Sequence, residues 1–333
     1  MRKQNWVAPA VVTALMLFAA VQGSAFLFLA LLAVPVIAAV LAYTSGWAWT
    51  AVTCLAAGAI GTWMMPGLAV IVVPWCALSA VIACVPLKRK MLRPLLWGGL
   101  CLGAWAAMIA LLNAAMDQPL IPGLAQAFCD WVDASPQRNN ILLNTYSLGL
   151  SRLDTQTGLT SLAFVLMPDN VRLQLLYSLR VSMEELLPSA LCEGLVYHTA
   201  LTVVLCVALP DWRRRRNGEP GVFPQMEKWY IPRKWGLAVT LLGLGWLFAY
   251  MSAGGVEMYL GLLCAAVFKT AYLLQGLCLL QWLEKRIGIR SVMRKIWAVA
   301  LSLLAPIVPI IMGIVDQRRD SRHLRPDEEV EIP

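Results

Sequence analysis

The chain has 333 residues, of which 59% are hydrophobic and only 14% are charged, and its mean hydropathy is +0.68. Soluble domains carry about a quarter charged residues, so this composition excludes a soluble enzyme. No Asp, Glu, Lys or Arg occurs from Gln4 to Leu87, although one membrane helix needs only about 20 apolar residues. The long continuous apolar runs also exclude an outer-membrane barrel, whose strands alternate over about 10 residues.

The net charge of +8 is concentrated in short basic clusters. Residues 88–93, 211–234 and 284–295 each carry a net charge of +4, whereas residues 117–193 carry −4. Cytoplasmic loops of membrane proteins are enriched in Lys and Arg, so we interpret these clusters as topology determinants on the cytoplasmic side. A lipid-headgroup or nucleic-acid site is the alternative for the clusters, and we expect no nucleic acid among the partners.

Apolar runs separated by turn residues predict the helices of the first third of the chain. Trp6 to Val21 and Ala25 to Tyr43 would form a helical hairpin, and the basic start before it predicts an uncleaved anchor with a cytoplasmic N-terminus. The run from Trp47 to Pro86 is long enough for two helices, broken near Met65-Pro66-Gly67 because proline interrupts a helix. Leu95 to Leu112 would cross the membrane next.

Residues 113–186 are too polar to span a membrane and too apolar for a disordered segment, so we expect an external region on the membrane surface. Pro168-Asp169-Asn170 is typical of a helix start, with Asp169 or Asn170 as N-cap. Apolar residues then recur at helical spacing among charged residues as far as Leu187. This pattern predicts an amphipathic helix in the membrane interface.

Three further runs, Leu187 to Leu209, Trp235 to Met251 and Met258 to Leu283, predict spans whose basic loops all lie inside. The last run, Ile296 to Val315, breaks this pattern because it would place arginines on both sides of the membrane. The final span would then be re-entrant, or a segment of the first half is miscounted, or the mixed-charge tail is tolerated outside.

We therefore expect an all-α polytopic membrane helix bundle of eight or nine spans with an external amphipathic helical segment. Its expected parts are N-terminal membrane helices (residues 1–112), the external region (113–186), C-terminal membrane helices (187–315) and a polar tail (316–333).

Polar side chains inside apolar helices are the best functional candidates, because placing them in hydrocarbon costs a few kcal/mol. Glu193 and Tyr197 are four residues apart on one helical face, with His198 about 100° further round. These groups could bind a polar solute or relay a proton. Alternatively, Glu193 has its carboxylate in water at the interface, and His198 hydrogen-bonds to a neighbouring helix.

The penultimate span carries a second polar group of residues. Lys269 lies too deep for a boundary residue, although a lysine stem can snorkel part of the way, and we expect it to balance Glu193 or an anionic ligand. The predicted ligand-binding residues of the two spans are Glu193, Tyr197, His198, Lys269, Tyr272 and Gln275.

The sequence shows no P-loop, HExxH, GxSxG or paired metal-binding aspartates, and it has only two histidines. Glu184-Glu185 resembles the paired glutamates of the prenyl-protein protease family, but Ser189 stands where that family has arginine. The nine cysteines lack a CxxC motif and lie mostly in apolar runs, although a bridge between Cys129 and Cys192 is conceivable. We expect no enzyme, no cofactor and no metal site.

Two C-terminal motifs resemble the YybS-like family of bacterial membrane proteins: Tyr272-Leu-Leu-Gln275-Gly276-Leu277, and Gly313-Ile-Val-Asp316 with Asp320 and Arg322 after it. Trp229 and Pro232 fit the same pattern, whereas Ser321 departs from an aromatic position of the family. The resemblance implies a multi-pass protein of the bacterial cytoplasmic (inner) membrane. That family is biochemically uncharacterised, and it is sometimes likened to the substrate-binding S components of energy-coupling-factor vitamin transporters.

S components dock on their transmembrane partner through small residues of the first helix, and Ala10 and Ala14 form such a pair here, although generic helix packing is the alternative. The charged residues after the last span could cap that helix with internally paired charges or could dock a partner. The candidate docking residues are Ala10, Ala14, Asp316, Arg319, Asp320 and Arg322.

These observations together predict a small-molecule binding or transport component in the lipid bilayer. Its ligand would enter from outside beneath residues 169–187, and a transmembrane energy-coupling subunit with ATPases would supply the energy. The alternative is a non-catalytic membrane scaffold in envelope growth or signalling.

Overall fold

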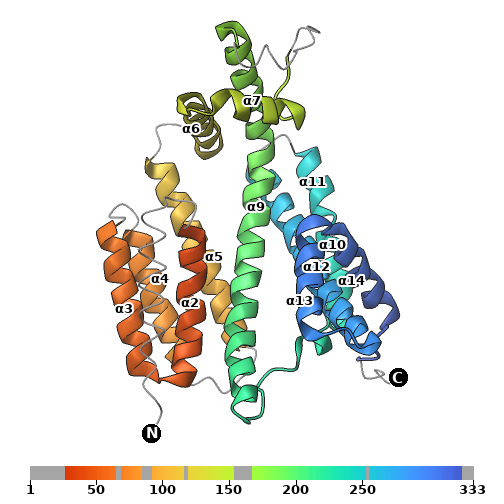
Figure 1. The fold of residues 1–333 in the computed structure, drawn as a ribbon. Helices are drawn as coiled ribbons and strands as arrows, with labels where there is room; N and C mark the ends of the chain where they lie inside the picture. The colour runs from red at the N-terminus through yellow and green to blue at the C-terminus, as the bar shows by residue number, and fades with distance from the viewer. Residues whose placement is uncertain are drawn as a thin grey trace. The chain divides into compact units, whose positions relative to one another are not determined.

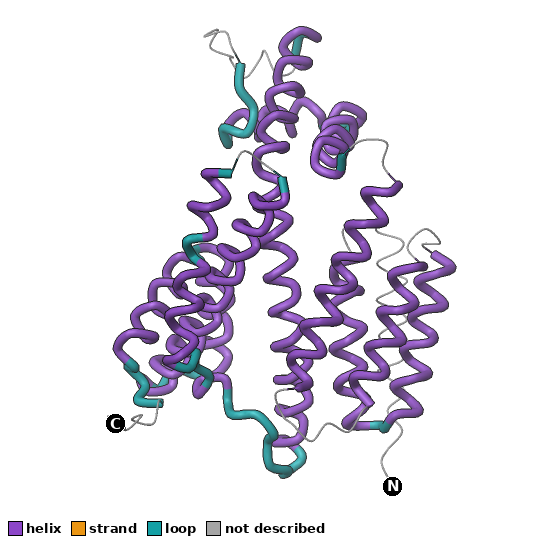
Figure 2. Tube along the Cα trace, turned by 180° about the vertical axis from the view of Figure 1, so that it is seen from behind, coloured by secondary structure: helices purple, strands orange, loops and turns teal. Residues whose placement is uncertain are grey.

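The structure, a computed structural model, describes residues 27–64, 69–84, 92–115, 119–153, 167–252 and 255–324. Within these ranges the regular elements are helices, and no strand occurs (Figure 2). The all-helical expectation is therefore confirmed for this part of the chain. The chain divides into two compact units, one of residues 1–107 with 195–333 and the other of residues 108–194.

The first described helices pack as a group: α2 (Leu27–Thr44), α3 (Trp47–Met64) and α4 (Ala69–Cys84) lie side by side (Figure 1). Gly46 has a φ of 91°, a conformation that suits glycine and lets the chain turn directly from α2 into α3. The described ends of α3 and α4 flank the predicted break at Met65-Pro66-Gly67. The predicted span Trp6 to Val21, with Ala10 and Ala14, lies outside the described residues.

One long helix, α9 (Asp169–Arg216), contains 48 residues and begins inside the predicted start signal. It continues through Leu187, where we expected the amphipathic segment to end and a separate span to begin. In the first unit, α9 packs against α5 (Leu92–Ala115), since a Cβ atom on Gly98 would lie 3.8 Å from Val203.

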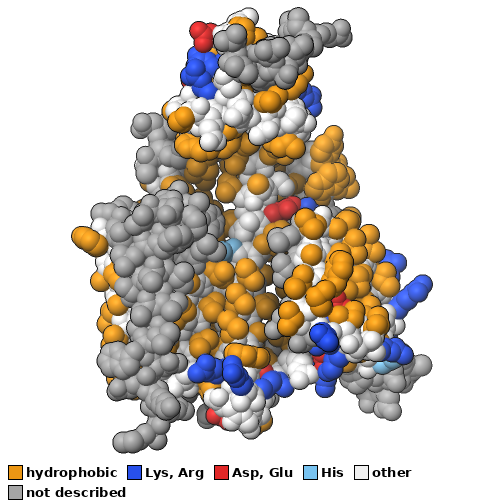
Figure 3. Space-filling model, in the orientation of Figure 1, with side chains coloured by type: hydrophobic (Ala, Val, Ile, Leu, Met, Phe, Trp, Pro, Cys, Tyr) orange, Lys and Arg blue, Asp and Glu red, His pale blue; other side chains and the backbone are white. Residues whose placement is uncertain are grey.

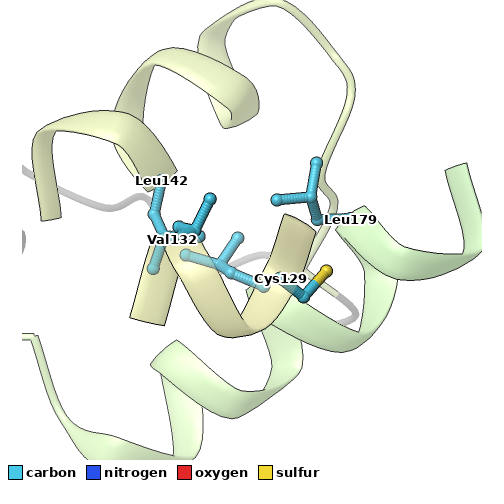
Figure 4. Close-up of a cluster of buried hydrophobic side chains, with 5 residues drawn as sticks. Cys129, Val132, Leu142 and Leu179 are labelled. Carbon is cyan, nitrogen blue, oxygen red and sulfur yellow. The ribbon is translucent and has the colours of Figure 1, made fainter. Parts of the chain in front are cut away.

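The second unit has a small apolar core of its own. α6 (Leu120–Ala134), α7 (Arg138–Ser147) and the first part of α9 enclose five buried side chains, four of which are labelled in Figure 4. These residues are Cys129, Val132, Leu142, Leu175 and Leu179. An ion pair of 3.1 Å between Arg172 Nη1 and Asp133 Oδ1 links α9 to α6 at the edge of this core.

The C-terminal helices of the first unit pack around α12 (Val256–Ile287), which contacts every other element of this group. The others are η3 (Met226–Lys228), α10 (Arg233–Leu242), α11 (Gly245–Met251), α13 (Ser291–Leu304) and α14 (Ile307–Arg319). The predicted span Trp235 to Met251 is thus divided between α10 and α11, and the last predicted span between α13 and α14, which are bent by 104°.

The predicted count of eight or nine spans is not supported by the described residues. Three helices are long and apolar enough to cross a membrane, or four if the bent pair Val292–Ser302 and Ile307–Arg319 is a single broken span. The three are Leu92–Ala114, Asp169–Arg216 and Val256–Ile287. The predicted span Trp6 to Val21 lies outside the described residues, and other apolar runs form described helices shorter than the roughly 20 residues of a crossing.

Large apolar side chains point outward on the helices of the first unit, and Figure 3 shows hydrophobic side chains over much of the visible face. Trp235, Leu237 and Leu304 are 59%, 70% and 85% exposed. Contiguous exposed apolar surface of this kind is rare on soluble monomers and fits contact with lipid.

Candidate functional site

A buried polar network joins α12, α14 and the residues after α14. Gln275 Nε2 donates a hydrogen bond of 3.0 Å to Asp316 Oδ2. Arg322 donates to the same oxygen from Nε at 3.2 Å and from Nη2 at 2.8 Å. Asp316 is 1% exposed and Arg322 is 5% exposed, so these charges pair inside the protein. Internally paired charges are one of the two roles that we expected for the charged residues after the last span.

The network extends to the connector before α10. Arg322 Nη1 donates to the backbone oxygen of Glu227 at 2.7 Å, and Glu227 Oε1 accepts a hydrogen bond of 2.6 Å from Lys285 Nζ. The backbone N–H of Ile231 donates to Gln275 Oε1 at 3.4 Å. The polar groups therefore tie η3 and its flanking residues to the ends of α12 and α14.

Two glycines allow α12 and α14 to approach closely enough for this network. A Cβ atom on Gly276 would lie 1.7 Å from the Pro309 carbonyl oxygen, and one on Gly313 would lie 2.1 Å from the Tyr272 carbonyl oxygen. Small residues at helix contacts permit such backbone approach in membrane proteins. The motifs around Gly276 and Gly313 therefore mark a helix–helix contact.

Tyr272 is also held by neighbouring helices. Its hydroxyl lies 2.8 Å from Thr240 Oγ1 and donates to the Gly236 carbonyl oxygen at 3.3 Å, while the residue is 1% exposed. Tyr272 and Gln275, predicted as ligand contacts, thus bond to the protein's own helices.

The remaining predicted ligand residues lie on α9 and α12. Trp105 Nε1 donates to His198 Nδ1 at 3.3 Å, and their rings meet edge to face, so His198 bonds to a neighbouring helix, as one of our alternatives stated. Tyr197 and Lys269 are half-buried on α9 and α12. Glu193 belongs to the other unit, so its pairing with Lys269 stays a prediction.

The other two tail residues differ from the buried pair. Arg319 is exposed at the end of α14, and Asp320 is half-buried with a φ of 44°. A docking role for this segment stays a prediction, and Arg319 is its most accessible charge.

A cavity of about 480 Å³ lies elsewhere in the first unit, among the ends of α2, α4, α5 and α9 and the connector after α9. Alanines and aromatic side chains form nearly half of its wall, including Tyr43, Trp47 and Trp97. Trp97 is 2% exposed, so it is fixed in the wall, whereas Trp47 is 73% exposed.

Three charged residues line this cavity: Arg93, Asp211 and Arg214. The Asp211 carboxylate accepts hydrogen bonds from Arg215 Nε at 2.9 Å, from the Phe223 N–H at 3.2 Å and from the Val222 N–H. Its negative charge is therefore balanced by Arg215, outside the cavity wall.

Arg214 is only partly engaged. Its guanidinium stacks over the Tyr43 ring at 5.3 Å and lies 3.6 Å from Glu219 Oε2, which is beyond a good hydrogen bond. Its Nε–H is buried and has no acceptor in the described part of the chain. A buried donor without an acceptor is costly, so an acceptor in the cavity would be stabilising.

The sequence analysis missed this cavity. Arg93 and Arg214 were assigned to topology because each belongs to a basic cluster at a helix end, and the alternative of a lipid-headgroup site was the only signal that pointed to binding. No cluster of His, Cys, Asp and Glu among the described residues could hold a metal ion. No disulfide joins Cys129 to Cys192, so the conceivable bridge is not formed.

Residues 167–317 match the model of a family described as "Predicted membrane protein (DUF2232)". The chain is a helical membrane protein. The match covers α9 to α14, and with them Gln275, Asp316 and the cavity residue Arg214. No curated protein and no solved structure matches the chain.

Proposed function

We propose that the protein is a small-molecule binding or transport component, with its site in the cavity beside Tyr43, Trp97 and Arg214. The observation that supports this proposal is the cavity itself, which has a volume of about 480 Å³. Ligand pockets typically measure about 300–1,000 Å³ and combine apolar walls with a few polar groups. The volume of this cavity lies in that range, and its wall combines apolar side chains with three charged residues.

The hydrogen bonds of Tyr272 and Gln275 favour the cavity over the ligand site that we expected from the sequence, which included these two residues. Both are buried and bonded to neighbouring helices, so a ligand there would have to displace packed contacts. The cavity offers space without such a displacement.

Charge supports a cytoplasmic opening for the cavity in a bacterial inner membrane. Arg213, Arg214, Arg215 and Arg216 form the last turn of α9, and Lys and Arg side chains gather at the lower end of the view, where α9 ends (Figure 3). Basic segments remain on the cytoplasmic side during insertion. On this proposal the ligand enters from the cytoplasm, not from the outside.

The resemblance to the YybS-like family, and through it to S components, favours a role within a larger transporter. The sequence carries no nucleotide-binding motif, so a partner with ATPases would supply the energy. No catalytic motif was found either, and we therefore propose a non-enzymatic role.

The test is to fill the cavity and measure what the purified full-length protein retains. Ala42 lines the cavity, whereas Ala59 is exposed on α3, so Ala42→Phe and Ala59→Phe form a matched pair. Mass spectrometry should find a small molecule in the wild type and in Ala59→Phe, and lose it in Ala42→Phe. Circular dichroism checks that both variants fold. Equal retention in both variants, or no retained molecule in the wild type, favours the scaffold.

A further inference from the structure

Two arginines and one aspartate are the charged residues that line the cavity. Asp211 is balanced by Arg215, and Glu219 approaches Arg214 only to 3.6 Å with its side chain 45% exposed. Arg93 adds a second guanidinium from the first turn of α5, where the helix dipole is also positive. An anion would therefore be favoured over a neutral or cationic ligand.

The two guanidiniums enter the cavity wall from separate helices, Arg93 from α5 and Arg214 from α9. Each guanidinium presents several donors in a fixed plane, which suits phosphate and carboxylate oxygens. A carboxylate offers two oxygens and one charge, whereas a phosphate monoester offers three free oxygens and a charge of about −1.5 to −2. Two arginines from separate helices therefore match a phosphate monoester better than a carboxylate.

Part of the cavity wall is apolar. Trp97, Ala83 and Val207 are all buried and line the same space as the arginines. A ligand with a charged head and an apolar body would contact both kinds of surface.

We propose that the cavity binds a phosphoryl group through Arg93 and Arg214, as part of an amphiphilic ligand. This inference rests on the proposed function and names the ligand class for the same site. The phosphoryl group is a monoester and belongs either to a phosphatidic acid in the membrane or to a soluble phosphate monoester that enters from the cytoplasm. Arg214 Nε, which lacks an acceptor among the described residues, becomes one of its donors.

The test measures binding of three probes to the full-length protein in detergent: dioleoylphosphatidic acid, dioleoylglycerol and inorganic phosphate. Native mass spectrometry follows the lipids, and equilibrium dialysis follows phosphate. The variants are Arg93→Gln and Arg214→Gln. Arg216→Gln is the control, because Arg216 is exposed, stacks over Trp212 at 5.5 Å and does not line the cavity.

We expect saturable binding of phosphatidic acid or of phosphate, weakened at least about tenfold by either cavity substitution and changed less than about twofold by Arg216→Gln. Binding of phosphatidic acid alone identifies a lipid headgroup, and binding of phosphate identifies a soluble source. Unchanged affinity in the two cavity variants overturns the inference. Equal binding of dioleoylglycerol overturns it too, as does failure of both phosphorus-bearing probes to bind.

The cavity-filling pair separates this inference from the proposed function. If Ala42→Phe loses a retained molecule that contains no phosphorus, the phosphoryl assignment is wrong and the binding function stands. If Ala42→Phe and Ala59→Phe retain the same molecule equally, the cavity is not its site and the proposed function fails with the inference.

Discussion

Gly276 shows how a single missing side chain sets the packing of α12 on α14. Its absent Cβ would lie 1.7 Å from the Pro309 carbonyl oxygen, a distance that only a backbone shift could relieve. We expect Gly276→Ala to destabilise the protein by about 1–3 kcal/mol or more, because overpacking displaces the helix. Thermal unfolding in detergent, followed by circular dichroism, measures this change.

Gly103 on α5 provides the control for that prediction. A Cβ atom there would meet nothing within 4 Å, so Gly103→Ala should be neutral or stabilise by about 0.5–1 kcal/mol through helix propensity. Equal effects of the two substitutions would contradict the close contact of α12 and α14.

The Asp316 and Arg322 pair makes a second prediction for single residues. Asp316→Asn leaves the Arg322 guanidinium buried without its carboxylate, and breaking a buried pair costs about 3–5 kcal/mol. Glu184→Gln removes a half-exposed pair with Arg180, which should cost only about 0.3–0.5 kcal/mol. Similar unfolding midpoints for both variants would show that the network is not buried.

The sequence identified Gln275, Asp316 and Arg322 as individual residues but assigned them to different roles. The sequence predicts Gln275 as a ligand contact, and it predicts Asp316 and Arg322 as docking residues. Their common network joins positions 41 residues apart, and local spacing carries no information on such a contact. Arg93 and Arg214 were missed as binding residues for the same reason, because five segments of the chain assemble the cavity.

At the scale of elements, α6, α7 and the first part of α9 share one small core, and Cys129 reports on it. Burial raises the pKa of the Cys129 thiol, and Asp130 raises it further. Maleimide reacts with the thiolate, so labelling should begin at a higher pH than the value of about 8.5 for a free thiol. A variant with alanine at the other cysteines permits this measurement.

The direction of the pH effect on stability follows from the same shift. The folded unit keeps the thiol proton at a pH where the unfolded chain has lost it, so this contribution is complete below the unfolded pKa and is lost as pH rises above it. Labelling of Cys129 at the same pH in folded and denatured protein would contradict its burial.

Leu142 tests the packing of this core directly. Leu142→Ala removes a fully buried side chain and should cost about 2–5 kcal/mol, which accelerates Cys129 labelling at least about tenfold through opening of the unit. Leu148→Ala, at a side chain that is 73% exposed, should leave the labelling rate within about twofold. Equal rates in the two variants would show that Leu142 does not hold the unit together.

Helix positions were more predictable than helix lengths. The turn before Trp47 and the start of α9 at Asp169 each follow from a local signal in the sequence, and the described ends of α3 and α4 flank the predicted break. The continuation of α9 through Leu187 does not, because the change from amphipathic to apolar composition there resembled a boundary although the helix runs on past Pro188. The composition of a helix indicates whether water or lipid surrounds it. It does not indicate where the backbone hydrogen bonding of the helix ends.

For the whole molecule, apolar composition predicted a membrane protein correctly, but the described residues do not support the predicted count of eight or nine spans. Apolar runs such as Trp235 to Met251 form short, broken helices, and the last run bends by 104° between α13 and α14. The bend is consistent with the re-entrant alternative, which would keep the basic residues before α13 and after α14 on one side. The topology then agrees with the positive-inside rule throughout the C-terminal helices.

We propose that the ends of α2, α5 and α9 enclose a ligand site. The decisive test of this site is a cryo-electron microscopy map of the full-length protein in lipid nanodiscs, with an antibody fragment bound for alignment. Our account predicts ordered non-protein density between Tyr43, Trp97 and Arg214. Direct packing of these side chains against one another, with no space between them, would contradict it.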